Sequence, residues 1–416
     1  MKQLLGYLTG ALVATVLIGS AKADTEPSPQ RWVVTWAASP QAPQSNAHLQ
    51  RKNGQTFRER FRATVGGAIL RVQLSNEFGA TPLVLGAATI ASPVDEATVK
   101  PESVKSLTFN GRMTAVIPAG APLLSDPVAF ALHRGSEVTI SLYLPQQMAT
   151  ATQHTLALRR AVISPPGDFT RSARIEAGAT IDSSVLVTAI IVPAARSQRL
   201  LVTLGDSLTD GDGDIVDADS KWPAALARRL VNGGGPAANI AVVNEGEIGN
   251  QLLRDVLGIN ALTRFDRDVL SLPGVTHVIL LEGINDIGMP GAAIGSHVLS
   301  EPSAAPTLED LTGAYQQLIA RAHAAGIRII GATLPPFEGA RIAGYYSESK
   351  ESMRQAVNHW IRTSRAFDAV IDFDAVLRDA QHPSQMQSRY VSSDHLHPNG
   401  AGYQAMADAV DVRLLN

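Results

Sequence analysis

The chain has 416 residues, 45% hydrophobic and 18% charged, so it is long enough for two domains with sizeable cores and is not disordered. It contains no cysteine, which excludes disulfide bonds, a thiol nucleophile and a cysteine-based metal site. The formal net charge of −3 gives no indication of a nucleic acid or an anionic membrane as a partner.

Residues 1–23 have the pattern of a secretory signal peptide. Lys2 gives a positive start, residues 4–18 are largely apolar and uncharged, and Ala21-Lys22-Ala23 fits the small-x-small cleavage rule. We expect cleavage after Ala23, export to the periplasm or the extracellular space, and no stable membrane insertion afterwards. An uncleaved anchor is the alternative, but the apolar run is short for a membrane span.

Residues 24–195 contain many short runs rich in β-branched residues, such as residues 84–90 and 138–144. Turn signals such as Asn110-Gly111 and Arg134-Gly135 separate these runs. The pattern predicts a β-rich N-terminal domain over residues 24–195, of the β-sandwich or jelly-roll type.

From residue 196 onward, strand patterns alternate with helical ones. Strands are expected at residues 199–204, 240–243, 276–281, 327–333 and 369–373, and helices near residues 222–231, 251–257, 307–325, 347–364 and 399–414. This alternation predicts an α/β domain over residues 196–416, with a doubly wound parallel sheet in the flavodoxin-like order and helices on both faces. In such sheets ligands bind beyond the C-terminal ends of the strands, beside the first strand.

Residues 288–306 are rich in Gly, Ala, Ser and Pro and show no clear period. A lid or specificity loop and a solvated connection are both consistent with this composition.

The segment Gly205-Asp206-Ser207-Leu208 directly follows the first strand of the α/β domain. A glycine turn after a buried strand projects the serine hydroxyl beyond the sheet edge, which makes Ser207 a candidate nucleophile. Serine catalysis also needs a base, a group that orients the base, and hydrogen-bond donors for the oxyanion.

Ten histidines are candidates for the base, and their positions in the chain separate them. His154 and two others lie in the strand-rich half, far from Ser207 in sequence. Asp394 precedes His397 by three residues, on a loop before the last helical pattern. We therefore expect Asp394 to orient His397, and His397 to accept the proton of Ser207. His395 is the nearest rival, but it lies one residue from Asp394 and would point elsewhere.

The oxyanion donors are expected from two further loops. Gly249 follows the second strand, and a glycine there lets a backbone N–H approach the substrate. Asn285, in Gly283-Ile284-Asn285-Asp286 after the third strand, can supply a neutral amide donor. Each segment alone is an ordinary strand-to-helix turn; together with the Ser207 and His397 segments they meet at one end of one predicted sheet.

These blocks resemble the SGNH, or GDSL, hydrolase superfamily, in the family's order across residues 200–416. The resemblance implies a Ser207–His397–Asp394 triad, and an oxyanion hole made by the Ser207 N–H, the Gly249 N–H and the Asn285 side chain. Longer segments resemble a narrower group of secreted bacterial arylesterases or acylhydrolases linked to xylan degradation. They include Trp32-Val33-Val34-Thr35-Trp36-Ala37-Ala38-Ser39-Pro40 and Leu281-Glu282-Gly283-Ile284-Asn285-Asp286-Ile287-Gly288.

We expect neither a metal nor a cofactor. Asp206 and Asp210 flank Ser207, but carboxylates beside a glycine turn more often bind local backbone N–H groups. The run Asp210-Gly211-Asp212-Gly213-Asp214 lacks the bidentate glutamate of a calcium loop, so a solvated loop is expected there.

The sequence therefore predicts a secreted serine esterase for short acyl esters, especially acetyl groups on carbohydrate, with a small ester or a polysaccharide ester as its partner. Three alternatives stay open. They are a lipase or lysophospholipase, a polysaccharide O-acetyltransferase with the same triad, and a non-catalytic glycan-binding protein.

Overall fold

The computed structural model describes residues 30–42, 54–146, 150–234 and 236–415. The described residues from Arg31 onward belong to one compact unit. The expected signal peptide and its cleavage after Ala23 lie outside the described residues. Within the described ranges, no helix combines the length and the apolarity that crossing a bilayer requires.

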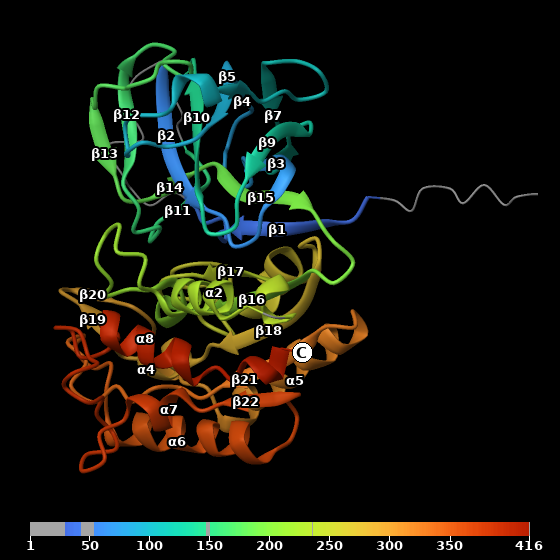
Figure 1. The fold of residues 1–416 in the computed structure, drawn as a ribbon. Helices are drawn as coiled ribbons and strands as arrows, with labels where there is room; N and C mark the ends of the chain where they lie inside the picture. The colour runs from blue at the N-terminus through green and yellow to red at the C-terminus, as the bar shows by residue number, and fades with distance from the viewer. Residues whose placement is uncertain (1–29, 43–53, 147–149, 235, 416) are drawn as a thin grey trace, which may run out of the picture. The chain divides into compact units, whose positions relative to one another are not determined.

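Strands up to Pro193 pair only in the antiparallel direction in the part of the chain that the structure describes. One sheet has the order β1-β15-β3-β8, with β9 also paired to β3, and a second has the order β13-β12-β2-β10-β5-β6 (blue to green in Figure 1). The bounds are β1 Trp32–Ala37, β2 Gln55–Arg62, β3 Gly67–Ser75, β4 Leu83–Leu85, β5 Ala87–Ala91, β6 Lys105–Ser106, β7 Ala115–Ile117, β8 Pro122–Leu124, β9 Val128–Leu132, β10 Glu137–Leu144, β11 Gln153–His154, β12 Ala161–Pro166, β13 Ala179–Ile181, β14 Ser184–Val185 and β15 Val187–Pro193. The N-terminal half is thus rich in antiparallel strands, as expected, while its sandwich or jelly-roll type stays a prediction.

Strands after Arg199 form a parallel sheet in the order β17-β16-β18-β21-β22. Their bounds are β16 Arg199–Gly205, β17 Ile240–Gly246, β18 Val275–Leu281, β21 Arg328–Ala332 and β22 Ala369–Ile371. Numbered along the chain, these strands lie in the order 2-1-3-4-5, so the chain leaves β16 to one side and later returns to its other side. Gly205 pairs with both Gly246 and Leu281, which aligns the C-terminal ends of the three strands.

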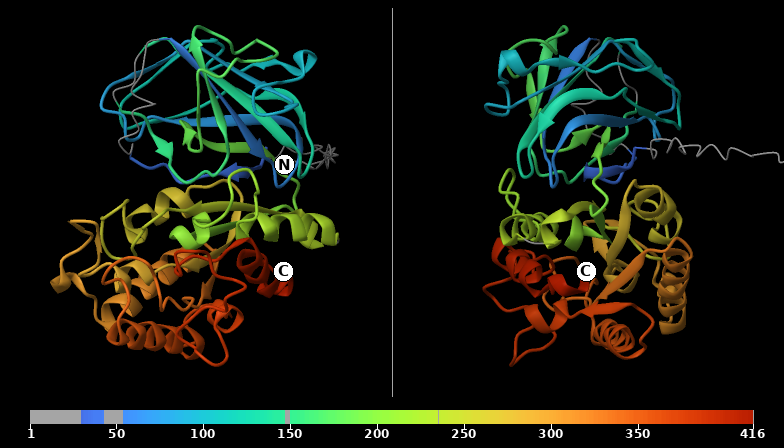
Figure 2. Two further views of the ribbon diagram at one scale, coloured as in Figure 1. Left: turned by 90° about the vertical axis from the view of Figure 1, so that its left-hand side faces the viewer. Right: turned by 45° about the vertical axis from the view of Figure 1, so that its right-hand side comes forward.

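The helices of this half are α1 Ser207–Asp210, α2 Trp222–Gly233, α3 Ala261–Phe265, α4 Ile284–Gly288, α5 Leu308–Ala324, α6 Glu348–Thr363, α7 Phe373–Leu377 and α8 Gly400–Ala409. Apolar residues at helical spacing bury one face of α5; they include Leu311, Tyr315, Leu318 and Ala322. The buried face of α6 instead combines Val357 and Ile361 with polar side chains such as Arg354. Helices α2 and α8 contact each other on one side of the sheet, and α5 lies on the other side with α6 against it (Figure 2).

The strand-rich and α/β halves share one continuous cluster of buried hydrophobic residues. Strand β1 packs beside β17, the Val34 N–H donates to the Pro273 carbonyl at 3.2 Å, and the Val242 N–H donates to Thr64 Oγ1 at 3.2 Å. The change from antiparallel to parallel pairing falls between Pro193 and Arg199, and the domain boundary at residues 195 and 196 stays a prediction.

Two expectations about local structure were wrong. Residues 251–257 are not helical, because the N–H groups of Leu252 and Leu253 donate to the Asp286 carboxylate at 2.7 and 3.0 Å instead of to a helical turn. The last helix begins after its Asn399 cap as expected but ends at Ala409, and a separate short turn, Val412–Leu415, follows.

The segment 288–306 contains regular structure. It forms a small hairpin of β19 (Ala293–Ile294) and β20 (His297–Val298), followed by a short turn at Pro302–Ala304. Ile294 and Val298 on this hairpin are 59% and 48% exposed.

Candidate active site

Ser207 begins α1 immediately beyond the end of β16. Asp206 caps this helix, and its Oδ1 accepts a hydrogen bond from the Leu208 N–H at 2.9 Å. A Cβ at Gly205 would lie 2.3 Å from the Leu281 carbonyl oxygen, so only glycine fits between strand and turn. This packing delivers the Ser207 hydroxyl to the end of the sheet, where the residue is 5% exposed.

The structure brings Ser207, His397 and Asp394 together. Ser207 Oγ lies 2.8 Å from His397 Nε2, and His397 Nδ1 lies 2.6 Å from Asp394 Oδ2. The other carboxylate oxygen of Asp394 accepts hydrogen bonds from the Ser392 hydroxyl and from the N–H groups of Leu396 and His397, at 2.6, 2.9 and 3.0 Å. These contacts fix the carboxylate and leave His397 Nε2 facing the serine.

The charges around the imidazole set its protonation. Burial alone lowers the pKa of His397, but the hydrogen bond to Asp394 and the charges of Asp212 and Asp394 outweigh it, so this pKa is raised. Asp212 Oδ2 lies 3.7 Å from the same Nδ1. Burial raises the pKa of Asp394, yet its contacts with His397 more than offset this and hold that pKa below its usual value. Asp394 is therefore ionised at neutral pH.

His395 does not share this position. Its ring lies against Gly339, where a Cβ would be 3.5 Å from His395 Nδ1. The backbone of His395 has a φ of 59°, which turns its side chain out of line with that of His397.

The two residues expected as oxyanion donors, Gly249 on a loop and Asn285 in α4, lie on segments that are hydrogen-bonded to each other. The Asn285 Nδ2 donates to the Asn250 carbonyl at 2.9 Å, one residue from Gly249. The Tyr345 hydroxyl donates to Asn285 Oδ1 at 2.7 Å, which fixes which end of the amide carries the N–H groups. Gly249 has a φ of 69°, and a Cβ there would lie 2.4 Å from Leu257.

Two backbone donors at this end of the sheet are unpaired. The N–H groups of Ser207 and Gly249 have no hydrogen-bond acceptor among the described residues. Unpaired donors of this kind are suited to an anionic oxygen.

A buried arginine links the strand ends that carry these loops. Arg264 Nη2 donates to the Gly205 carbonyl at 2.8 Å, Nη1 donates to the Glu245 carbonyl at 2.7 Å, and Nε donates to Asn250 Oδ1 at 3.0 Å. Asp268 is its nearest counter-ion, with Oδ2 3.0 Å from Nη1. Arg264 is 1% exposed, so these bonds are shielded from water.

One residue of the strand-rich half, His154, contacts the segment that follows Ser207. His154 Nδ1 lies 3.0 Å from the Ser39 carbonyl, and Nε2 lies 3.0 Å from Asp210 Oδ1. Both ring nitrogens face acceptors, which requires an imidazolium with two donors. The other oxygen of Asp210 accepts from the Ile248 N–H at 3.2 Å, next to Gly249.

Sequence reasoning did not find Tyr345, Arg264 or His154. Each acts on a residue more than fifty positions away or lies outside any short motif, so no local pattern marks it. Asp206 binds a local N–H as expected, whereas Asp210 is held mainly by distant partners, including Lys221 Nζ at 3.5 Å.

Within the described ranges, no three His, Asp or Glu side chains are grouped as metal ligands. The absence of a metal and of a cofactor stays a prediction.

The His154–Asp210 pair predicts a pH-dependent contribution to stability. Burial lowers the pKa of His154, but Asp210 outweighs it and raises that pKa. The contribution is therefore full below about pH 6.5, the unfolded value, and is lost as the pH rises through the native pKa. We expect His154→Ala to lower the free energy of unfolding by about 3–5 kcal/mol in mild acid, because it leaves the Asp210 carboxylate without this partner.

Urea unfolding of the wild type and of His154→Ala at about pH 5.5 and about pH 9 tests this prediction. The decrease in the free energy of unfolding should be smaller at the higher pH. His133→Ala, an exposed histidine of the same half, is the matched control and should match the wild type. A loss for His154→Ala that is equal at both pH values would contradict the assignment of a charged His154.

Comparison with known proteins gives a family match for the α/β half. A family model described as GDSL-like Lipase/Acylhydrolase matches residues 201–410, about half of the chain. Comparison with curated proteins gives no match.

Several solved structures are similar to the chain. One is described as a lipolytic protein of the G-D-S-L family from Desulfitobacterium hafniense, 23% identical, covering 52% of this chain and 99% of that one at a TM-score of 0.38. A GDSL-like lipase from Bacteroides thetaiotaomicron is 16% identical, covering 53% and 90% at a TM-score of 0.39. A catalytic mutant of an acetylxylan esterase from Geobacillus stearothermophilus is 21% identical, covering 51% and 91% at a TM-score of 0.37.

The family match confirms the resemblance seen in the sequence motifs, while the narrower xylan-related group stays a prediction. The match spans the parallel sheet and the segments that carry Ser207, Gly249, Asn285, Asp394 and His397. The chain therefore belongs to the GDSL-like lipase/acylhydrolase family, and it is a carboxylic ester hydrolase.

Proposed function

We propose that the protein is an exported serine esterase that removes short acyl groups, chiefly acetyl groups, from carbohydrate. The observation that carries the mechanism is the hydrogen-bonded series Ser207 Oγ, His397 Nε2, His397 Nδ1 and Asp394 Oδ2. The carbohydrate ester is supported by the expected signal peptide and by the resemblance to secreted xylan-related acylhydrolases.

In the first half-reaction, His397 Nε2 takes the proton from Ser207 Oγ as this oxygen bonds to the ester carbonyl carbon. The carbonyl oxygen becomes an oxyanion, which accepts hydrogen bonds from the Ser207 N–H, the Gly249 N–H and the Asn285 amide. The bond to the alcohol oxygen then breaks, and the alcohol leaves with the proton from His397. Asp394 keeps the imidazole oriented and stabilises its charged form.

In the second half-reaction, His397 takes a proton from water as the water oxygen bonds to the acyl carbon. The same three donors hold the second oxyanion. Its collapse releases the carboxylic acid and returns the proton to Ser207 Oγ. The unpaired N–H groups and the fixed Asn285 amide support this because such donors need no rearrangement when charge develops.

A longer acyl group is the second candidate. Leu257, 44% exposed, lies against Gly249, and the β19–β20 hairpin that follows α4 exposes Ile294 and Val298. These apolar side chains suit an acyl chain of several carbons, as a lipase or lysophospholipase would bind.

Substitution of the proposed nucleophile and of one oxyanion donor tests the mechanism. Ser207→Ala should lower kcat for p-nitrophenyl acetate by at least about 10⁴-fold, because no other group replaces the nucleophile. Asn285→Ala should lower kcat by about 10²–10³-fold, with little change in KM, since the donor acts on the oxyanion.

Exposed residues supply the controls, Ser349→Ala for the serine and Asn239→Ala for the asparagine, and both should keep wild-type rates. Near-wild-type turnover by Ser207→Ala would exclude the proposed nucleophile.

The raised pKa of His397 predicts the pH profile. The base must be neutral, so kcat/KM should rise with pH through a midpoint above about 6.5. Asp394→Asn should lower this midpoint, because it removes a charge that favours the imidazolium, and it should lower kcat by about 10⁴-fold.

Two nearby acids are part of this test. Asp212→Asn should shift the midpoint in the same direction but by less, since its carboxylate is 3.7 Å from Nδ1. Burial raises the pKa of Asp206 to about 7, so its own titration also affects the acid limb. A kcat/KM that does not change as the pH rises through the expected midpoint would argue against His397 as the base.

A substrate panel separates the candidate functions. We expect acetate release from acetylated polysaccharides, and rates on p-nitrophenyl esters that fall as the acyl chain lengthens. Ser207→Ala protein is the blank for spontaneous hydrolysis. Rates that peak at long chains would instead support a lipase, and acetylated sugar formed from a sugar acceptor would support an O-acetyltransferase.

A further inference from the structure

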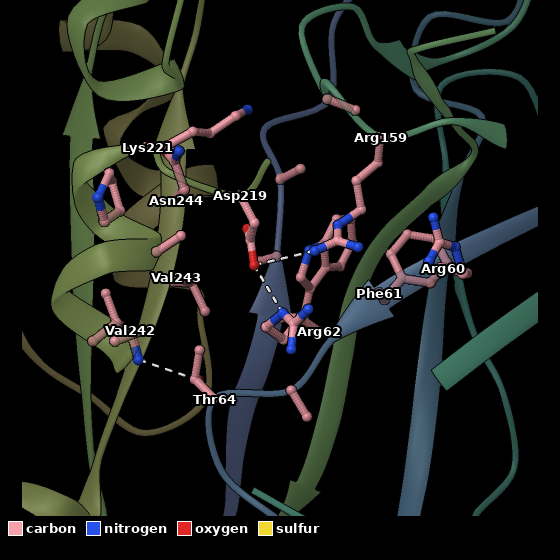
Figure 3. A pocket seen from close by; sticks show the side chains of 18 of the residues that line it. Arg60, Phe61, Arg62, Thr64, Arg159, Asp219, Lys221, Val242, Val243 and Asn244 are labelled. Atoms are coloured by element: carbon pink, nitrogen blue, oxygen red, sulfur yellow. Dashed lines mark hydrogen bonds and ion pairs between the residues drawn. The ribbon is translucent and has the colours of Figure 1, made fainter. Parts of the chain in front are cut away.

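A cavity of about 330 Å³ lies apart from Ser207, between β2 of the strand-rich half and the α2 and β17 segment of the other half (Figure 3). Apolar groups form much of its wall, among them Trp36, Phe61, Pro223, Ala227 and Val231. Its size falls at the lower end of small-molecule sites, which are roughly 300–1,000 Å³. The cavity therefore suits a compact ligand with an apolar body.

The remaining wall is strongly basic. Six arginine and lysine side chains line the cavity against two carboxyl groups, those of Asp219 and Glu59; the six are Arg60, Arg62, Arg159, Arg160, Lys221 and Arg228. Figure 3 shows Arg62 and Arg159 converging on Asp219, and their nitrogens lie 2.8 and 3.1 Å from its carboxylate. Burial raises the pKa of Glu59 to about 8, so at neutral pH this carboxyl group adds no negative charge.

Some N–H groups of these cationic side chains have no hydrogen-bond acceptor among the described residues. Arg60 Nε is buried and has no hydrogen-bond acceptor among the described residues, whereas Arg159 Nη2 is paired with Asp219 Oδ2 at 3.1 Å. The Arg160 side chain is exposed and makes no hydrogen bond or ion pair with any described residue. Glu137 and Asp217 pair with part of this group, and the cations still outnumber the ionised carboxylates. Buried guanidinium donors without acceptors are matched best by carboxylate oxygens.

We propose that this cavity binds a small amphipathic carboxylate, with its apolar body against Trp36, Phe61 and Ala227 and its carboxylate beside Arg60 and Arg160. Two sources share this chemistry. One is the acid that the esterase itself releases, and the other is a free organic acid from the surroundings.

The position of the cavity relates it to the catalytic loops. His154 and Lys221 both line it, and both contact Asp210 Oδ1, at 3.0 and 3.5 Å. Asp210 in turn holds the Ile248 N–H beside Gly249. A ligand in the cavity would therefore share its wall with residues that contact Asp210.

Isothermal titration of the full-length Ser207→Ala protein with sodium hexanoate tests the proposal without turnover. We expect one site per chain, with hexanamide and acetate bound at least about tenfold more weakly, since each lacks one half of the proposed recognition. Arg160→Ala should weaken hexanoate about tenfold, the effect of losing one charge-assisted hydrogen bond. Ala224→Leu, which fills the cavity from a partly exposed position on α2, should abolish binding.

Arg112→Ala, an exposed arginine of the same half outside the cavity, is the matched control and should bind hexanoate as the parent does. The proposal is overturned if hexanoate does not bind at up to about 10 mM, if hexanamide binds equally well, or if both cavity variants bind as the parent does. Both cavity variants keep the triad, so their loss of binding is distinguishable from a failure of the proposed mechanism.

A series of acids compared with the matching p-nitrophenyl esters distinguishes the two sources. Acids that bind in the same order as their esters are hydrolysed indicate a product site, and a different order indicates a free acid from outside.

Discussion

One buried charge, the guanidinium of Arg264, holds the catalytic end of the sheet together. It donates to the carbonyl of Gly205, two residues before Ser207, and to the carbonyl of Glu245 on the neighbouring strand. Removing such a group from water costs several kcal/mol, and this cost is offset only when its donors are well matched. Here backbone carbonyls, Asn250 and the Asp268 carboxylate provide that match.

The acids around Arg264 show what its charge does. Burial and neighbouring carboxylates raise the pKa of Glu245 and of Glu282 well above the ordinary value. Burial also raises the pKa of Glu247. Burial by itself would lower the pKa of Arg264, yet the charges of Glu247, Asp268 and Glu282 raise it, so the arginine stays charged. The strand ends that lead to Ser207 and to Gly249 are thus held with little freedom to move.

Much of the fold and of the candidate site followed from the sequence, because those features are local. The strand-turn-helix at Ser207 needs a glycine and a capping aspartate within two residues, and Asp394 lies three residues from the histidine it contacts. Apolar runs likewise located the five parallel strands, since four of them are buried along most of their length.

What the sequence did not reveal depends on contacts between distant segments. Residues 251–257 carry a helical pattern, but Asp286 takes the N–H groups of Leu252 and Leu253. Tyr345 orients Asn285 from 60 positions away, and His154 holds Asp210 from 56. A single side chain in an otherwise ordinary segment gives no periodic signal, so only the tertiary fold shows its role.

The contacts of the strand-rich half also bear on how this enzyme can be divided. Ser39 Oγ lies within hydrogen-bond distance of both Glu247 and Asp268, the latter at 2.7 Å, and Arg267 Nη1 lies 2.8 Å from Glu77. A shortened chain that starts at residue 196 would keep every residue of the proposed triad and of the proposed oxyanion hole. It would still lose the Ser39 hydroxyl, which contacts Glu247 and Asp268. It would also lose the Glu77 carboxylate that pairs with Arg267, and the His154 imidazolium that pairs with Asp210. The α/β half is therefore not an independent unit, and fusions or chimaeras of this enzyme need to include both halves together.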